Sequence, residues 1–375
     1  MIYLISGISI FLCLIAFLSV IWIIFPAPSY YIWLYSVAVS EWSLWLGFAA
    51  LVGIILAVFS KTPTILYPSI ILGGSAFLIS LYPYFSLLSI AKEKEISLSF
   101  SQYFAAITGG KQKEVQFQTR VFSKRNDADL KVDIYLPDAD KPSNGVSIIV
   151  IHGGSWSGGV RNDFPQWNSW FAENGLTVFD IDYTLAPQPN YLSAIDDVKE
   201  AVKWVKQNTQ EFNISPDKIV LLGRSAGGHL ALIAAYSANK TENQVRGVIS
   251  VYAPTDLIWD YDNLANEYVI DGRGTLSSFL GGNPHQSPEI REKYLFASPT
   301  EHISSETPPT LLIHGGKDQL VRLENMYRLA DKLNASNVRN ETLYIPYGQH
   351  GFDYNINGWG SQLTKTAILK FVKDF

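Results

Sequence analysis

The sequence has few of the features that mark several common functional classes. Cys13 is the single cysteine among 375 residues, so the chain forms no internal disulfide; this fits a reducing compartment but is compatible with an oxidising one. There is no His-Glu-x-x-His segment and no clustered spacing of metal ligands, which argues against a metal hydrolase. The formal net charge is −5 and no basic stripe is present, which argues against a general nucleic-acid-binding protein.

Charge is almost absent from the first quarter of the chain. Up to residue 91 the only charged side chains are Glu41 and Lys61, whereas charge is spread evenly from Lys92 onward. About 20 apolar residues cross ~30 Å of hydrocarbon as a helix. A cleaved signal peptide would begin with basic residues, which are missing here, and it would not account for more than one apolar stretch. We therefore predict three transmembrane helices rather than buried soluble helices, within residues 2–25, 44–59 and 64–90.

This contrast divides the chain into a membrane domain (residues 1–91), a linker (92–113) and a catalytic domain (114–375). Three spans place the N-terminus and the catalytic domain on opposite sides of a bilayer. Lys92, Lys94, Lys111 and Lys113 follow the third span. The positive-inside rule therefore favours a multi-pass protein with a cytoplasmic catalytic domain, although these few lysines leave the orientation open.

Strand and helix patterns alternate through the catalytic domain. Residues 114–122 and 130–136 alternate apolar and polar positions, as in an antiparallel pair at a sheet edge. Further strands are predicted at residues 147–151, 176–181, 218–222, 245–251, 310–313 and 342–345, and helices at 168–173, 191–207, 228–238, 323–333 and 360–372. Apolar strands between amphipathic helices indicate an α/β fold whose mostly parallel sheet is covered on both faces. Residues 255–306 are too long for an ordinary connection and are predicted to form a cap.

An apolar run ends abruptly at Gly223-Arg224-Ser225-Ala226-Gly227 and is followed by a helical pattern. Gly-x-Ser-x-Gly between a strand and a helix is typical of a nucleophile elbow, which exposes the serine hydroxyl at a tight turn. The next backbone N–H, that of Ala226, is then free to bind an oxyanion. We predict Ser225 as a nucleophile.

A serine nucleophile needs a base, and the base needs a carboxylate to orient it. In elbow-containing hydrolases the order along the chain is serine, acid, histidine. Asp318 follows the strand at 310–313 and His350 follows the strand at 342–345, so both satisfy this order. Asp353 is interpreted as a surface carboxylate or turn cap, and Asp180 and Asp182 precede the serine. The other histidines are interpreted as follows: His229 and His314 as structural residues, and His285 and His302 as cap residues without a visible partner.

The segment Ile151-His152-Gly153-Gly154-Ser155-Trp156 ends another predicted strand. Glycines after a strand leave backbone N–H groups free to stabilise a developing oxyanion, worth ~3 kcal/mol per donor. We predict that Gly154, Ser155 and Ala226 form an oxyanion hole, and that His152 braces the loop.

Together these motifs resemble the α/β-hydrolase superfamily, specifically its hormone-sensitive-lipase-like and carboxylesterase-type serine esterases. The resemblance covers about residues 115–375 and includes residues 152–154, 182–187, 194–204, 223–227, Asp318 and His350. It implies hydrolysis of a carboxylic ester through an acyl-serine, with no metal or other cofactor. Two departures are Ser155, where many relatives have glycine, and Arg224, where an acidic or amide residue is frequent.

The sequence therefore predicts a membrane-anchored serine esterase with the triad Ser225, His350 and Asp318. Its expected substrates are small-molecule or lipid-like esters, the latter reached from the lipid bilayer. A peptidase or amidase of the same fold would need the same triad and stays open as an alternative. A catalytically silent membrane scaffold is a further alternative, which the complete set of motifs disfavours.

Overall fold

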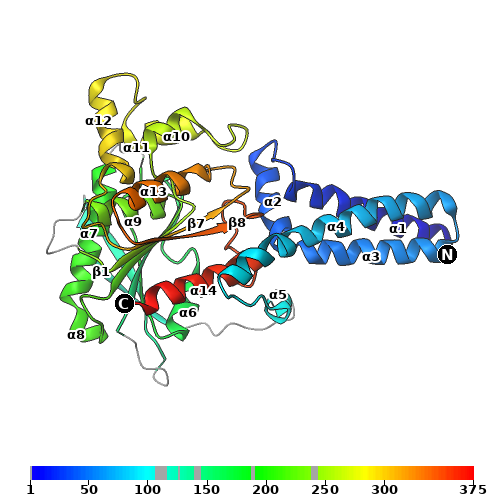
Figure 1. Ribbon diagram of the computed structural model, residues 1–375, viewed down its shortest axis with the longest axis horizontal. Coiled ribbons are helices and arrows are strands. Elements are labelled where there is room, and N and C mark those ends of the chain that lie inside the picture. The colour runs from blue at the N-terminus through cyan, green and yellow to red at the C-terminus, as the bar shows by residue number, and fades with distance from the viewer. Residues whose placement is uncertain (1, 106–115, 126, 139–144, 187–190, 238–243) are drawn as a thin grey trace.

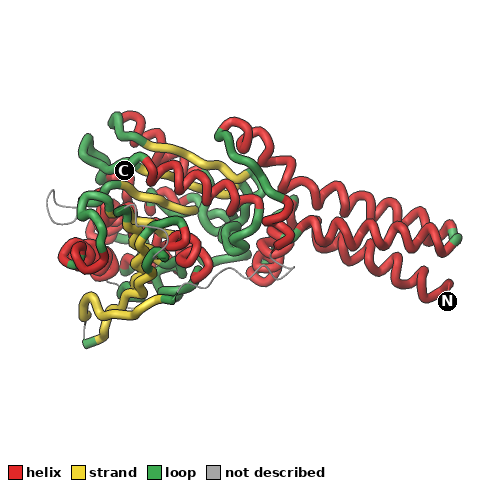
Figure 2. The backbone as a smooth tube through the Cα atoms, turned by 90° about the horizontal axis from the view of Figure 1, so that it is seen from below, coloured by secondary structure: helices red, strands yellow, loops and turns green. Residues whose placement is uncertain are grey.

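The computed structural model describes residues 2–105, 116–125, 127–138, 145–186, 191–237 and 244–375. A bundle of long helices projects from one side of an α/β domain, and the N-terminus lies at the far end of this bundle (Figure 1). Seen from below, the strands are confined to the α/β domain (Figure 2). Residues 106–115, which hold the end of the predicted linker and the start of the first predicted strand, lie outside the described residues, as do Pro187 and Ala238.

Three N-terminal helices are long and apolar enough to cross a membrane, in agreement with the three predicted stretches. They are α1 (Ile2–Val20), which continues into the short 3-10 helix η1 (Ile21–Ile23), α3 (Ser43–Ser60) and α4 (Pro63–Glu93). Small residues allow these helices to pack closely. The Ser9 hydroxyl donates to the Gly53 carbonyl oxygen at 2.8 Å, and a Cβ on Gly53 would lie 2.6 Å from Cys13 Sγ.

Eight strands of the described residues form one sheet in the order β1-β2-β4-β3-β5-β6-β7-β8. The strands are β1 (Phe117–Arg125), β2 (Ala128–Tyr135), β3 (Ser147–Ile151), β4 (Thr177–Ile181), β5 (Ile219–Arg224), β6 (Gly247–Val251), β7 (Thr310–Gly315) and β8 (Asn340–Ile345). The pairs β1–β2 and β2–β4 are antiparallel and the remaining pairs are parallel. The predicted mostly parallel sheet with an antiparallel edge is confirmed.

Helices cover both faces of this sheet (Figure 1). Because side chains alternate along a strand, Ile149 and Ile151 of β3 point into one hydrophobic cluster and Ile148 and Val150 into the other. The first cluster contains residues of α7 (Tyr191–Gln207), α8 (Thr209–Phe212), α9 (Ala226–Tyr236) and α13 (Glu324–Ala335), and the second contains residues of α6 (Pro165–Glu173) and α14 (Trp359–Lys373).

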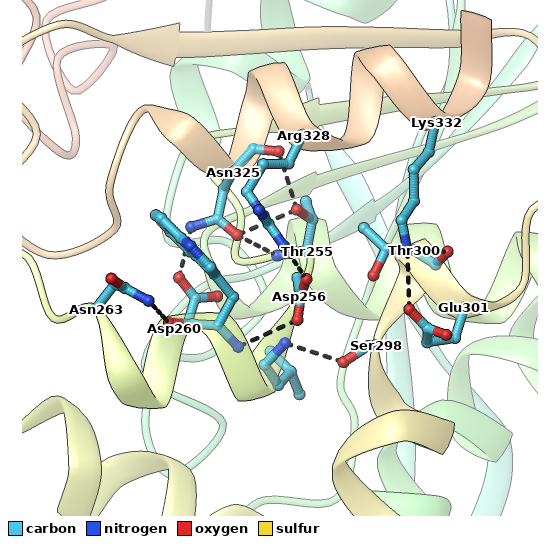
Figure 3. Close-up of polar contacts among 12 residues, drawn as sticks. Thr255, Asp256, Asp260, Asn263, Ser298, Thr300, Glu301, Asn325, Arg328 and Lys332 are labelled. Atoms are coloured by element: carbon cyan, nitrogen blue, oxygen red, sulfur yellow. Dashed lines mark hydrogen bonds and ion pairs between the residues drawn. The ribbon is translucent and has the colours of Figure 1, made fainter. Parts of the chain in front are cut away.

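The cap segment between β6 and β7 is helical. It comprises α10 (Leu257–Asp262), α11 (Gly272–Leu280), α12 (Pro288–Ala297) and the 3-10 helix η2 (Pro299–Glu301). Polar contacts tie the cap to α13 (Figure 3): Arg328 donates to the Asp256 carboxylate at 2.6 Å, and the Asn325 amide joins the Thr255 backbone to Asp260. The cap is therefore fixed to the domain at this end.

The described part of the segment that joins the helical bundle to the sheet, residues 92–105, is packed on the α/β domain. Helix α5 (Phe100–Ala105) places Tyr103 in a fully buried position, with its ring stacked on Trp359 at 4.4 Å. The Ser99 N–H donates to Gln362 Oε1 at 2.7 Å, and Leu87 of α4 joins the α14 cluster. A six-residue helix is too short to show an amphipathic period, so sequence patterning does not reveal this packing.

Candidate active site

Ser225 occupies a sharp turn between β5 and α9. Its backbone angles, φ 55° and ψ −123°, are strained for a residue with a side chain, and such strain concentrates at functional sites. The turn requires glycine on both sides, since a Cβ on Gly223 would lie 2.1 Å from the Gly227 carbonyl oxygen. A Cβ on Gly227 would lie 2.2 Å from the carbonyl oxygen of Ile151. The sequence motif therefore folds into the turn that was predicted for it.

The structure brings Ser225, His350 and Asp318 together from three separate loops. Ser225 Oγ lies 2.9 Å from His350 Nε2, and His350 Nδ1 lies 2.7 Å from Asp318 Oδ2. A carboxylate only accepts hydrogen bonds, so Nδ1 carries the proton. Nε2 is then free to accept the hydroxyl proton of Ser225. This is the geometry that a general base needs in order to activate a serine.

The Asp318 carboxylate is completely buried and its two oxygens have separate partners. Oδ1 accepts the backbone N–H groups of Leu320 and Val321 at 2.8 and 2.9 Å, while Oδ2 faces His350 and, at 3.3 Å, His314 Nε2. Burial by itself would raise the pKa of Asp318, but the two imidazole rings hold that pKa well below its usual value. Asp318 is therefore ionised and fixed in orientation.

The predicted oxyanion loop follows β3 and lies beside Ser225. Gly154, at φ 114°, has no room for a side chain, because a Cβ there would lie 2.2 Å from the Gly158 carbonyl oxygen. Ser155 is also in the left-handed region, at φ 54°. Ser155 and Ala226 line the cavity next to Ser225, and Gly154 forms the turn that precedes Ser155. The N–H of Ala226 is at the start of α9, where helix N–H groups have no partner within the helix.

His152 lies under this loop. Its Nδ1 donates to the Gly153 carbonyl oxygen at 2.7 Å and its ring stacks on Tyr183 at 4.3 Å. Burial is the main influence on its pKa, which is lower than that of a free histidine. These contacts brace the loop, as the sequence analysis expects for this residue.

The cavity beside Ser225 is small and mostly apolar. It has a volume of ≈ 60 Å³ and its walls come from the cap, the oxyanion loop and the loop after β7, including Ile270, Leu276 and Leu320. A water-sized group needs at least about 10–15 Å³, so the cavity holds only about four to six such groups.

An ion pair behind the elbow was missed by the sequence analysis. Arg224 Nε lies 2.5 Å from Asp353 Oδ2, and both side chains are buried, at 3% and 0% exposure. The Tyr252 hydroxyl donates to the other carboxylate oxygen of Asp353 at 2.6 Å, and the Trp167 indole N–H donates to the backbone carbonyl oxygen of Asp353. The interpretation of Asp353 as a surface carboxylate or turn cap is therefore wrong: it links β5 to the loop that carries His350.

His229 is completely buried in α9 and connects three parts of the site. Its Nε2 donates to the Ala297 carbonyl oxygen of the cap at 2.7 Å, and its Nδ1 accepts the indole N–H of Trp156 at 3.1 Å. Burial lowers the pKa of His229 to about 4, so it is neutral near pH 7. The only sequence signal for this role is a histidine in an otherwise apolar helix.

The remaining histidines lie apart from Ser225. His314 is buried beside Asp318, with Nε2 3.0 Å from the Val321 carbonyl oxygen. His285, which has no visible partner in the sequence, pairs with Asp262 at 2.7 Å on the exposed surface of the cap, and His302 contacts a carbonyl oxygen. Within the described part of the chain, no group of three or more metal-ligating side chains is found.

Known proteins similar to this chain include several that are named as ester hydrolases. The model of the BD-FAE family matches residues 132–333. The curated "Probable carboxylic ester hydrolase LipM" of Mycobacterium tuberculosis is 29% identical over 229 residues, which are 58% of this chain and 52% of LipM. "Esterase LipQ" of the same organism is 29% identical over 248 residues, covering 64% of this chain and 56% of LipQ. The chain thus spans little more than half the length of these curated relatives.

A solved structure extends the comparison to the fold. The propionate-bound form of Est2, a thermophilic esterase from the planctomycete Thermogutta terrifontis, superimposes with a TM-score of 0.56 at 25% identity. The match covers 70% of this chain and 94% of Est2. The α/β-hydrolase fold expected from the sequence is confirmed.

Proposed function

Because this chain belongs to the BD-FAE family, we propose that it is a carboxylic ester hydrolase that acts through an acyl-serine intermediate. The observation that carries the proposal is the continuous set of hydrogen bonds from Ser225 through His350 to Asp318, beside a small apolar cavity. The similarity to proteins named as ester hydrolases supports an ester as the substrate.

In the proposed mechanism, Ser225 Oγ attacks the ester carbonyl carbon as His350 Nε2 accepts the hydroxyl proton. Asp318 stays ionised and stabilises the imidazolium that forms. The carbonyl oxygen becomes an oxyanion, which accepts hydrogen bonds from the N–H groups of Ser155 and Ala226, with Gly154 as the third predicted donor. The tetrahedral intermediate collapses when the alcohol leaves with the proton from His350.

Hydrolysis of the acyl-serine repeats these steps with water. His350 removes a proton from the water molecule, whose oxygen attacks the acyl carbon, and then returns the proton to Ser225 Oγ. Each oxyanion-hole N–H contributes ~3 kcal/mol to the stabilisation of the transition state in comparable sites. No metal is required at any step.

We further propose that α1, α3 and α4 hold the enzyme in a lipid bilayer. Their length and apolar composition support this, as do the many large apolar side chains exposed on these helices, among them Phe11, Phe48 and Phe59. A membrane anchor favours substrates that are partly lipophilic, because such esters concentrate at the bilayer.

The decisive test is covalent labelling of the full-length protein by a fluorescent fluorophosphonate, with Ser225→Ala as the comparison. We expect the parent protein to be labelled and the variant to be unlabelled. A folded parent protein that takes up no label would refute the enzyme proposal. The catalytically silent membrane scaffold would then be the remaining alternative. Hydrolysis of matched p-nitrophenyl esters and p-nitroanilides then separates an esterase from an amidase.

A further inference from the structure

The loop that carries Asp318, residues 316–323 (here the acid loop), is held by the N-terminal segment as well as by the α/β domain. The Lys317 ammonium donates to the Ile24 carbonyl oxygen at 3.4 Å, and the Ala27 N–H donates to Gln319 Oε1 at 2.7 Å. Leu320 packs against a small apolar cluster that contains Ala27 and Trp33. Residues on both sides of Asp318 therefore contact the segment between the first candidate span and α2 (Tyr30–Glu41).

Gln319 is the centre of these contacts. Gln319 is 7% exposed, and both the oxygen and the nitrogen of its side-chain amide form hydrogen bonds. Oε1 accepts the Ala27 N–H and, at 2.9 Å, the Asn266 amide of the cap, while Nε2 donates to Gln349 Oε1 at 3.0 Å. Gln349 is 2% exposed and directly precedes His350. The side-chain amide of Gln319, the residue directly after Asp318, thus bonds both the residue before His350 and the N-terminal segment.

The position of Asp318 depends on this loop. The N–H groups that hold Asp318 Oδ1 are those of Leu320 and Val321, which follow Gln319 in the same loop. A shift of Gln319 would move these donors and the carboxylate together. A displacement of ~1 Å in a catalytic group costs about 10²-fold in rate.

We propose that Gln319 is a positioning residue that couples the N-terminal helical segment to the Asp318–His350 pair. On this view the segment around Ala27 is a structural component of the active site and more than an anchor. The inference rests on the proposed ester hydrolase function. It concerns residues that contact no reacting atom and act only through their neighbours.

The test uses the full-length protein and the variant Gln319→Met, which keeps the length of the side chain but removes its hydrogen bonds. Gln362→Met is the matched control. Gln362 is also a buried glutamine, 4% exposed, whose amide bonds Ser99, which precedes α5, and the Asn357 carbonyl oxygen, seven positions after His350. Among the described contacts, its amide has no hydrogen bond to the acid loop or to Gln349. Both variants lose buried amide hydrogen bonds across the same junction.

Active sites are counted by fluorophosphonate titration, and kcat and KM for p-nitrophenyl butyrate are measured per titrated site. We expect Gln319→Met to lower kcat about 10- to 100-fold with KM changed less than about 2-fold, since the acyl cavity is intact. Gln362→Met should retain kcat. Adding Gln349→Met to Gln319→Met should cause little further loss, because the two residues act through one hydrogen bond.

Hydrogen exchange at the Leu320 and Val321 amides gives a second readout that needs no substrate. Exchange at both should accelerate in Gln319→Met and stay at the parent rate in Gln362→Met. Unchanged kcat and exchange in Gln319→Met, or equal losses in the two variants, would overturn the coupling. If the parent protein itself takes no label, the enzyme proposal fails, and the exchange comparison alone decides whether Gln319 holds the acid loop.

Discussion

The buried pair of Arg224 and Asp353 gives a prediction whose size follows from the structure. In Arg224→Met the Asp353 carboxylate, at 0% exposure, loses the charged partner that lies 2.5 Å away. Removing one member of a buried ion pair costs about 3–5 kcal/mol. Tyr252 still donates to Asp353, which places the expected loss near the lower value, about 3 kcal/mol.

This loss is measurable as a change in thermal stability. For domains of 150–250 residues 1 kcal/mol shifts the Tm by about 2–4 °C, so we expect Arg224→Met to lower the Tm by about 6–12 °C. Activity should also fall, because Asp353 lies three positions after His350 and fixes its loop. The assay is thermal unfolding of the full-length protein in detergent micelles, together with kcat per fluorophosphonate-titrated site.

Two further variants make the result interpretable. Arg339 pairs with Asp374 on the surface, at 43% and 54% exposure, and Arg339→Met should cost at most about 1 kcal/mol. The double variant Arg224→Met, Asp353→Leu removes the buried Asp353 carboxylate together with its partner, so part of the lost stability should return. Equal stability of Arg224→Met and Arg339→Met, or strictly additive losses in the double variant, would refute the reasoning.

Three other predictions address the site. The pKa of His229 in the folded protein is about 4, so between pH 6.5 and 4 the unfolded state binds a proton that the folded state does not. The parent protein should therefore lose up to about 3 kcal/mol of unfolding free energy as the pH is lowered through this window. His229→Gln should lose less over the same window, which urea unfolding midpoints would measure. In an acyl series of p-nitrophenyl esters, acetate to butyrate should exceed octanoate in kcat/KM at least about 10-fold, because the ≈ 60 Å³ cavity holds few groups; equal rates would contradict this. Gly154→Ala should reduce kcat about 10²- to 10³-fold, since its Cβ would displace the oxyanion loop, and an unchanged kcat would remove that loop from the mechanism.

The sequence was sufficient for the features that depend on local pattern and chain order. Apolar strands alternating with amphipathic helices predicted the sheet, and the Gly-x-Ser-x-Gly turn predicted the position of Ser225. The rule that the acid and then the histidine follow the serine selected Asp318 and His350, which the structure brings within hydrogen-bond distance of each other.

The residues that sequence reasoning missed are buried polar groups whose partners are distant in the chain. Arg224 and Asp353 are 129 positions apart, and Ala27 and Gln319 are 292 apart. A single charged or amide residue in a loop looks the same whether it faces solvent or a buried partner. Only the tertiary fold determines whether the residue is exposed or buried, because burying a charged or amide side chain costs free energy unless a hydrogen-bonding partner is in place.

On the proposal that α1, α3 and α4 hold the protein in a bilayer, the length of α4 has a consequence for the orientation of the α/β domain. At 31 residues the helix is about 46 Å long, about 16 Å more than a hydrocarbon layer of ~30 Å. Its last turns are embedded in the α/β domain through Leu87. If the bilayer thins, the helix must tilt to hide its apolar surface, and the α/β domain must lean with it. Membrane thickness would thereby set the angle at which the cavity beside Ser225 faces the lipid headgroups.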